Sequence, residues 1–253
     1  MNKISAYFLV FLLAACSQEK PVEKPKVLKK KMVQIIPDEP KPEPKSKHAL
    51  SATERYMLKN GLVNLQEIDS SIQVNLMYND TCNFLHIKIY DSLSIAFLPP
   101  EIAKKLSAAQ QYLKQTNSSL SLIVFDAARP HHIQKFIWDS LKMEPNLKYN
   151  YVATPWDISL HNYGAAVDLS IKDLNKNALL DMGTSFDFFG QLAEPRYEYK
   201  FVKSKALSDT AYKNRLLLRS VMKKAGFSSI PSEWWHFNSC GKEFAAQTYT
   251  LIK

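Results

Sequence analysis

The composition of this chain changes abruptly near residue 49, and the change decides which part can fold. Residues 17–48 alternate Lys, Glu and Pro, with nine lysines, five acidic residues and few apolar ones. Such a segment buries too little apolar surface to offset the entropy that ordering costs. Proline stiffens it toward an extended form. We therefore expect a tether ahead of a globular part that covers 49–253.

The first sixteen residues, MNKISAYFLVFLLAAC, have the pattern of an export signal. Lys3 provides the positive start, an apolar run follows, and two alanines precede Cys16. The run is too short to span a membrane as a permanent helix. A cysteine directly after Leu-Ala-Ala resembles the lipobox of bacterial lipoproteins, in which the Cys16 thiol is acylated and becomes the new N-terminus. The alternative is an ordinary secretory signal with an incidental cysteine.

These features predict three regions: a lipoprotein signal peptide at 1–15, the lipidated cysteine with a disordered Lys/Pro-rich tether at 16–48, and one domain at 49–253. The expected location is that of an exported bacterial lipoprotein, membrane-anchored and periplasmic or at the cell surface. Several acyl chains anchor a protein durably. Export also permits a disulfide between Cys82 and Cys240, although the sequence does not show that the two meet.

The net charge of +9 would suggest a nucleic-acid partner if it lay in one part of the chain, but it is spread along the sequence. The tether contributes 9 − 5 = +4 and Lys3 adds one, which leaves 23 − 19 = +4 for residues 49–253. The domain therefore has a mildly basic surface without a basic stripe, and we expect no nucleic-acid partner. A lysine-rich tether next to a membrane fits anionic lipid or cell-wall polymer better.

Three segments of the domain have apolar residues at helical spacing. The first begins at Pro100 and continues through EIAKKLSAAQQYLKQT, the second begins near Pro130, and the third covers 209–225 with Gly226 placed to end it. The apolar stripe of the first consists of Ile102, Leu106, Ala109 and Leu113, and that of the second of Ile133, Phe136, Ile137 and Leu141.

Four shorter segments predict strands, at 72–78, 121–126, 165–171 and 231–237. In the third, Ala166, Asp168 and Ser170 would face one way and the residues between them the other. Strands and helices interleave without the regular alternation of βαβ units. This order favours an α+β fold, a single domain with a central antiparallel sheet flanked by helices.

Two segments that lie far apart in the sequence carry candidate metal-ligating residues. SLHNYGAAVDLSI at 159–171 contains His161 and Asp168, and PSEWWHF at 231–237 contains His236. A catalytic zinc typically has three protein ligands of these types and an open fourth position. Gly164 permits a turn between the first two. Taken singly these residues are weak signals, since a histidine beside tryptophans is more often a core residue bonded to a carbonyl.

Glu233, three residues before His236, is the candidate general base. On a strand, positions i and i+3 point to opposite sides, so the backbone must bend if both serve one site. The alternative for Glu233 is a solvated edge residue. Arg129 in FDAARPHH follows a buried strand, where it can stabilise negative charge developing on a carbonyl oxygen. The alternative for Arg129 is a structural ion pair with Asp126.

The combined pattern resembles a known family. S-x-H-x-x-G-x-A-x-D at 159–168, followed by E-W-W-H at 233–236, is similar to the zinc D,D-peptidases that share a core with the hedgehog signalling domain. FDAARP, DMGTSFD at 181–187 and MYNDTCNF at 77–84 narrow the resemblance to the D-alanyl-D-alanine dipeptidases, the group with the vancomycin-resistance dipeptidase. The similarity covers roughly 65–240. The second alanine of FDAARP stands where relatives often have an aromatic residue. The resemblance therefore does not predict the shape of the pocket near Arg129.

The resemblance implies one zinc ion per chain and a role for each matching position. Zinc would be bound by His161, Asp168 and His236, with Glu233 as the base, Arg129 as transition-state stabiliser, Asp187 at the substrate's amine, and Ser159 and Tyr78 as further substrate contacts. The expected activity is hydrolysis of D-Ala-D-Ala or a similar small dipeptide. The alternatives are a peptidoglycan D,D- or L,D-carboxypeptidase or endopeptidase, and a zinc-containing lipoprotein that binds the cell wall without turnover.

Overall fold

The computed structural model describes residues 49–90, 92–144, 148, 152, 154 and 156–253. The predicted signal peptide, the lipidation site Cys16 and the tether lie outside these residues, so the three regions and the membrane anchor stay predictions. Within the described part of the chain, no helix has both the length and the apolar character needed to cross a bilayer.

The sheet on which the domain is built has the strand order β2–β4–β5–β8–β7, with β6 paired to the end of β5. Its strands are β2 (Gln73–Val74), β4 (Leu120–Asp126), β5 (Ala166–Asp173), β6 (Ala178–Leu179), β7 (Ser228–Ser229) and β8 (His236–Asn238). All pairs are antiparallel except β2 with β4. The short strands β1 (Val63–Asn64) and β3 (Phe97–Leu98) form a separate antiparallel pair. The predicted α+β fold is confirmed, and only the edge strand β2 runs parallel to its neighbour.

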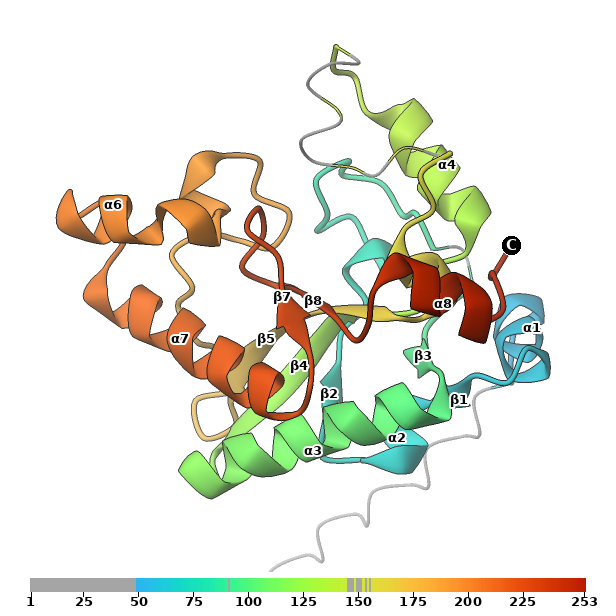
Figure 1. Cartoon of the computed structure of the whole chain (residues 1–253), viewed down its shortest axis with the longest axis horizontal. Coiled ribbons are helices and arrows are strands. Elements are labelled where there is room, and N and C mark those ends of the chain that lie inside the picture. Colours follow the sequence, from blue (N-terminus) through green and yellow to red (C-terminus); the bar gives the residue numbers. More distant parts are fainter. Residues whose placement is uncertain (1–48, 91, 145–147, 149–151, 153, 155) are drawn as a thin grey trace, which may run out of the picture. The chain divides into compact units, whose positions relative to one another are not determined.

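Helices flank this sheet (Figure 1). The α-helices are α1 (Ala52–Lys59), α2 (Leu65–Ile68), α3 (Pro100–Thr116), α4 (His131–Ser140), α6 (Glu198–Lys203), α7 (Asp209–Lys224) and α8 (Lys242–Thr248). Short 3₁₀ turns are η1 (Met77–Asn79), η2 (Leu160–Tyr163), η3 (Gln191–Ala193) and η4 (Pro195–Tyr197). Helices α3 and α7 pack against each other, α3 also against β4 and α7 also against β5.

The two longest helices form where the sequence predicts them. Pro100 opens α3, since the first turn of a helix needs no backbone N–H at that position. Its predicted apolar stripe is buried, and each buried Leu or Ile stabilises the fold by about 1.5–3 kcal/mol. Helix α7 ends at Lys224, and Gly226 follows with a φ of 86°. Glycine adopts this left-handed conformation without steric cost.

The predicted face of α4 is wrong at Phe136, whose side chain is 43% exposed. The helix instead buries Gln134, Ile137 and Trp138. The Oε1 atom of Gln134 accepts a hydrogen bond of 2.7 Å from Nη1 of Arg129. A polar side chain thus occupies a position that the hydrophobic pattern assigned to solvent, because it has a buried charged partner.

The predicted strands at 72–78 and 231–237 are shorter than expected. Strand β2 ends at Val74, and the chain then turns into η1. Residues 231–235 bend, and β8 begins only at His236. Trp234 and Trp235 are both buried within this bend.

The central strands carry the core of the domain. All seven residues of β4 are buried, as are the first six of β5. A β-bulge between Val124 and Asp126 shifts the register of this pair, so that Asp126 lies opposite Asp168. Bulges re-aim side chains, and this one, in β4, brings the carboxylate of Asp126 beside Asp168. Cys82 and Cys240, whose pairing the sequence left open, are both free thiols.

Candidate active site

Asp168 and His236 are brought together by the sheet itself. They are direct partners in the antiparallel pair of β5 and β8, so their side chains project from the same face. Oδ1 of Asp168 lies 3.0 Å from Nδ1 of His236. The sequence only suggested that these two distant residues meet, and the pairing of β5 with β8 places them opposite each other.

His161 comes from η2, just before β5. The Ser159 hydroxyl caps this turn by accepting from the His161 N–H at 3.3 Å, and Gly164 ends it with a φ of 64°. A side chain at Gly164 would place its Cβ 2.8 Å from Cδ of Pro99, so both the backbone angle and the packing require glycine. The turn returns the chain so that the imidazole of His161 lies against the start of β5.

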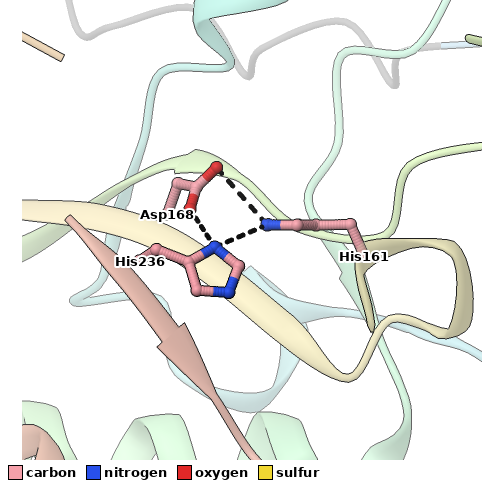
Figure 2. A group of neighbouring side chains, drawn as sticks. All are labelled: His161, Asp168 and His236. Carbon is pink, nitrogen blue, oxygen red and sulfur yellow. Dashed lines mark hydrogen bonds and ion pairs between the residues drawn. The ribbon is translucent and has the colours of Figure 1, made fainter. Parts of the chain in front are cut away.

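The three predicted metal ligands meet at one point (Figure 2). Nε2 of His161 is 3.2 Å from Nδ1 of His236 and 3.4 Å from Oδ2 of Asp168. One ligand atom from each residue lies within 4.8 Å of the others. His161 and Asp168 are buried, and His236 is partly exposed on the cavity side. These are distances that one divalent ion can bridge.

The outer nitrogens of both histidines are already engaged. Nδ1 of His161 lies 2.8 Å from the carbonyl oxygen of Ala127, and Nε2 of His236 lies 2.7 Å from Oδ1 of Asn238. Both oxygens are acceptors, so each of these nitrogens carries a proton, which leaves the other nitrogen of the neutral ring to present its lone pair to a metal. Such outer hydrogen bonds orient metal-ligating histidines. Two nitrogens and one carboxylate oxygen fit zinc.

The cluster has unusual proton affinities. Burial alone would raise the pKa of the Asp168 carboxyl, but the charge and hydrogen bond of His161, together with the hydrogen bond from His236, lower it well below its usual range. Burial alone would lower the pKa of His236, but its hydrogen bond to Asp168 and the charge of that carboxylate raise it to about 9. Asp168 is thus a carboxylate ready to bind a cation.

Arg129 lies on the cavity wall beside the cluster and is itself buried. Its Nε and Nη2 donate to Oδ2 of Asp126 at 2.8 and 2.6 Å, and Nη2 is 3.7 Å from Oδ2 of Asp168. The sequence offered an ion pair with Asp126 as the alternative role of Arg129. This ion pair is present, and it holds the guanidinium at the cavity wall. The hydroxyl of Tyr90 donates to the other oxygen of Asp126 at 2.6 Å and fixes this carboxylate in turn.

Glu233 lies in the bend before β8. Its Oε2 is 3.9 Å from Nδ1 of His236, so the bend resolves the conflict that a regular strand would have posed. Burial, followed by the negative charge of Asp168, raises the pKa of the Glu233 carboxyl even though His236 opposes the shift. A carboxyl with a raised pKa beside these candidate metal ligands suits a proton carrier.

Asp187 lies on the same cavity wall with a left-handed backbone, φ 56°. The hydroxyl of Tyr78 donates to its Oδ1 at 3.5 Å, a weak hydrogen bond, while the buried Oδ2 has no partner among the described residues. Burial, followed by the charge of Asp168, raises the pKa of the Asp187 carboxyl well above its usual value. A buried oxygen without a partner at a cavity wall is a site for a donor from a ligand.

One cavity of about 240 Å³ is lined by all eight residues that the sequence singled out for metal, catalysis and substrate. They are Tyr78, Arg129, Ser159, His161, Asp168, Asp187, Glu233 and His236. The structure brings them together, while the role of each stays a prediction. The cavity lies below the size typical of sites for drug-sized ligands, which favours a small substrate.

Sequence reasoning missed the residues that hold the others in place. Asn238 and the Ala127 carbonyl orient the imidazoles, and Gln134 and Tyr90 support Arg129 and Asp126. Only Asn238 had a local signal, because it lies two residues after His236 on a strand and so shares its face. The others come from elements whose packing the sequence does not reveal.

Comparison with known proteins agrees with this geometry. The family model described as D-ala-D-ala dipeptidase (Peptidase_M15) matches residues 58–253. The chain belongs to this family. As a member of the D-Ala-D-Ala dipeptidase family it is a metallopeptidase, and the resemblance predicted from the motifs is confirmed.

Two relatives are D-alanyl-D-alanine dipeptidases. The one from Escherichia coli (strain K12) is 33% identical over 179 residues, covering 70% of this chain and 83% of the relative. The one from Enterococcus faecalis is 25% identical over 196 residues, covering 71% and 92%. A solved vancomycin resistance D,D-pentapeptidase in complex with Zn(II) is 17% identical, covers 62% of this chain and 80% of its own, and has a TM-score of 0.36. That likeness is too low to support a conclusion about this family member.

Proposed function

We propose that this chain is a zinc-dependent dipeptidase that hydrolyses D-Ala-D-Ala or a similarly short dipeptide. The observation that carries the proposal is the convergence of ligand atoms of His161, Asp168 and His236 within 4.8 Å at the wall of a small cavity. Two imidazoles and one carboxylate leave a fourth position open for reaction. The activity named for the Escherichia coli and Enterococcus faecalis relatives supports the substrate class.

The three ligands would hold the ion, with the Ala127 carbonyl and Asn238 keeping both imidazole lone pairs aimed at it. A zinc ion bound there would lower the pKa of water from about 15.7 to roughly 7 and polarise the substrate carbonyl. The chain itself supplies a rigid donor set from a turn and two adjacent strands, and sites built on such elements keep their geometry.

Glu233 moves the proton. Its carboxylate takes a proton from the attacking water and returns it to the nitrogen of the leaving amine as the peptide bond breaks. Burial and Asp168 raise the pKa of Glu233, which brings its proton affinity closer to that of a general base working near neutral pH. Its place beside His236, outside the ligand set, leaves the carboxylate available for this work.

Arg129 stabilises the carbonyl oxygen as negative charge develops on it. Asp126 and Gln134 hold its guanidinium from two sides, at 2.6 and 2.7 Å, so the cation needs no rearrangement during the reaction. A fixed cation in a buried site acts more strongly on developing charge than one in water.

Asp187 binds the free ammonium of the substrate. Its unpartnered buried Oδ2 can accept from that ammonium, whose positive charge would favour the ionised carboxylate. Tyr78 and Ser159 line the same cavity and are assigned as further substrate contacts. An ammonium site at the end of the cavity restricts cleavage to short peptides with a free N-terminus.

We also propose that the enzyme is an exported lipoprotein, anchored through acylated Cys16 at the periplasmic or outer surface of a membrane. An enzyme outside the cytoplasm suits dipeptide scavenging or cell-wall turnover better than destruction of a cytoplasmic precursor. Metabolic labelling with a fatty acid tests this. Label on the native chain and none on Cys16→Ser supports the anchor, and equal label on both contradicts it.

The substrate is tested by comparing D-Ala-D-Ala with a muropeptide digest, using the zinc-loaded enzyme. Release of free D-Ala from the dipeptide, with muropeptides left intact, supports the proposal. Cleavage of muropeptides alone would make the chain a carboxypeptidase or endopeptidase instead. Zinc binding with neither activity would make it a cell-wall binding protein.

A further inference from the structure

The segment that carries Asp187 is long and irregular. It runs from Asp181 to Ala193, between β6 and the end of η3. Its middle places Asp187 in a left-handed backbone conformation, which aspartate adopts more readily than most residues but which still costs strain. Contacts made outside the cavity can hold the segment in this conformation.

Arg215 of α7 contacts the segment near both ends. Its Nε donates to the carbonyl oxygen of Met182 at 2.6 Å, and its Nη1 donates to that of Leu192 at 3.1 Å. The side chain is completely buried, with 0% exposure. Asp187 lies between these two anchored carbonyls in the chain. A planar guanidinium can hold two backbone carbonyls at once in fixed geometry, whereas a lysine ammonium cannot reproduce that fork.

Other residues of α7 also contact this segment. Nδ2 of Asn214 donates to the carbonyl oxygen of Asp181 at 2.7 Å. Gly183 has no side chain, and a Cβ there would lie 3.3 Å from Cβ of Ala211 and 3.5 Å from Nη2 of Arg215, both on α7. It would also lie 2.3 Å from Cδ1 of Leu207, just before the helix. Close packing of this kind transmits the position of the helix to the segment.

Arg215 also touches the segment that carries Glu233. Its Cζ lies 5.8 Å from the ring centroid of Trp234, the residue after Glu233. The indole N–H of Trp234 donates to Oγ1 of Thr184 at 2.8 Å, which ties the two segments together. One buried cation therefore contacts two of the chain segments that bring acidic side chains to the cavity, those of Asp187 and Glu233.

The ion pair with Glu198 alone does not account for the complete burial of Arg215. Glu198 is already paired in bidentate fashion by Arg219, whose Nη1 and Nη2 donate at 2.8 and 2.6 Å. Arg215 reaches the same carboxylate only at 3.2 Å. A fully buried second arginine is costly to desolvate, so its hydrogen bonds to backbone carbonyls are the reason for its position.

We propose that Arg215 is a positioning residue that holds the 182–192 segment so that Asp187 faces the cavity. This inference rests on the proposed role of Asp187 as the ammonium site. Arg215 contacts neither the metal ligands nor the substrate, and acts through the carbonyls of Met182 and Leu192. Arg219 shares Glu198 but, among the residues that the structure describes, makes no hydrogen bond to this segment, so it provides a matched control.

The test is a double-mutant cycle on the zinc-loaded full chain with D-Ala-D-Ala. Arg215→Lys should raise KM about tenfold, the coupling expected between residues in one hydrogen-bonded network, and Arg219→Lys less than about twofold. In an Asp187→Asn background, Arg215→Lys should raise KM no further. An equal rise in both backgrounds would mean that Arg215 acts on general stability and would overturn the inference.

Amide hydrogen exchange provides a readout that does not need activity. Arg215→Lys should accelerate exchange within 182–192 and leave β4 and β5 unchanged, whereas Arg219→Lys should leave all three unchanged. If Arg215→Lys does not fold, Asn214→Ala takes its place, because it removes another hydrogen bond from α7 to the segment. It should also accelerate exchange within 182–192, but to a smaller extent. Unchanged exchange in 182–192 contradicts the inference. Failure of the native enzyme to cleave D-Ala-D-Ala contradicts the proposed function instead, and the exchange result still decides whether Arg215 holds the segment.

Discussion

His236 lies directly opposite Asp168 in the antiparallel pair of β5 and β8, with Nδ1 and Oδ1 3.0 Å apart. Nε2 of His161 completes the set from the turn before β5. The ligand geometry thus depends on sheet register and on one turn.

Asn238 should control metal affinity although it is outside the ligand set. Its Oδ1 accepts from Nε2 of His236 at 2.7 Å and so turns the other nitrogen toward the metal. Loss of such an outer hydrogen bond typically weakens metal binding about 10–100-fold. We expect this loss for Asn238→Ala, measured by zinc competition with a chelator. Asn175→Ala, on an exposed turn, should bind zinc like the native protein. Equal affinities of all three proteins would contradict the assignment.

Protein stripped of metal should lose stability as the pH rises from about 6.5 to about 9. The pKa of His236 is raised to about 9 by Asp168, against about 6.5 in the unfolded chain. The charged imidazole therefore stabilises the fold fully below pH 6.5, and this contribution disappears as the pH rises through 9. Zinc needs the neutral imidazole, so its affinity should increase over the same interval.

The measurement is the melting temperature of the stripped protein against pH, with His236→Ala as the control. The native protein should show the decline between pH 6.5 and 9, and the variant should lack it. A decline of the same size in both proteins would assign the effect to other groups.

Glu233→Gln should separate metal binding from catalysis. The amide keeps the size of the side chain but does not carry a proton to the leaving amine, so we expect kcat to fall about 10²–10⁴-fold. The zinc content should stay that of the native protein, because Glu233 is 3.9 Å from Nδ1 of His236 and outside the ligand set. Glu243→Gln on the exposed face of α8 is the matched control. An unchanged kcat would reject Glu233 as the base.

Gly164 should be much less replaceable than Gly226, although both have a left-handed backbone. Alanine at Gly226 meets no atom within 4 Å and should cost only the left-handed strain, about 1–2 kcal/mol. Alanine at Gly164 also meets Cδ of Pro99 at 2.8 Å, which should add to that loss and displace His161. Denaturant unfolding measures both costs, and a zinc titration measures the displacement. Equal costs and unchanged zinc affinity would show that the turn does not position His161.

The sequence predicts well those elements whose pattern and environment agree. Strand β4 is a short apolar run, β5 and helices α3 and α7 have clear periodicity, and a proline or glycine marks an end of each of the two helices. The motif segments meet as expected because each lies on or beside neighbouring strands. Here local propensity and tertiary packing favour the same structure.

The sequence fails where tertiary contacts override the local pattern. Phe136 is exposed because buried Gln134 bonds Arg129 on the inner side of α4. The expected strand around Glu233 is a bend, in which the indole N–H of Trp234 donates to Oγ1 of Thr184, a contact that the local pattern does not reveal. The supports at Ala127 and Arg215 act through backbone carbonyls, which leave no trace in residue type.

One zinc ion, held by His161, Asp168 and His236, should enable hydrolysis of a short dipeptide. D-Ala release from D-Ala-D-Ala, measured on protein stripped of metal and then titrated with zinc, tests this. Activity should rise in proportion to added zinc and level off at one ion per chain, and His236→Ala should stay inactive throughout. Cleavage by the stripped protein, or none at any zinc level, would rule out this role of the ion.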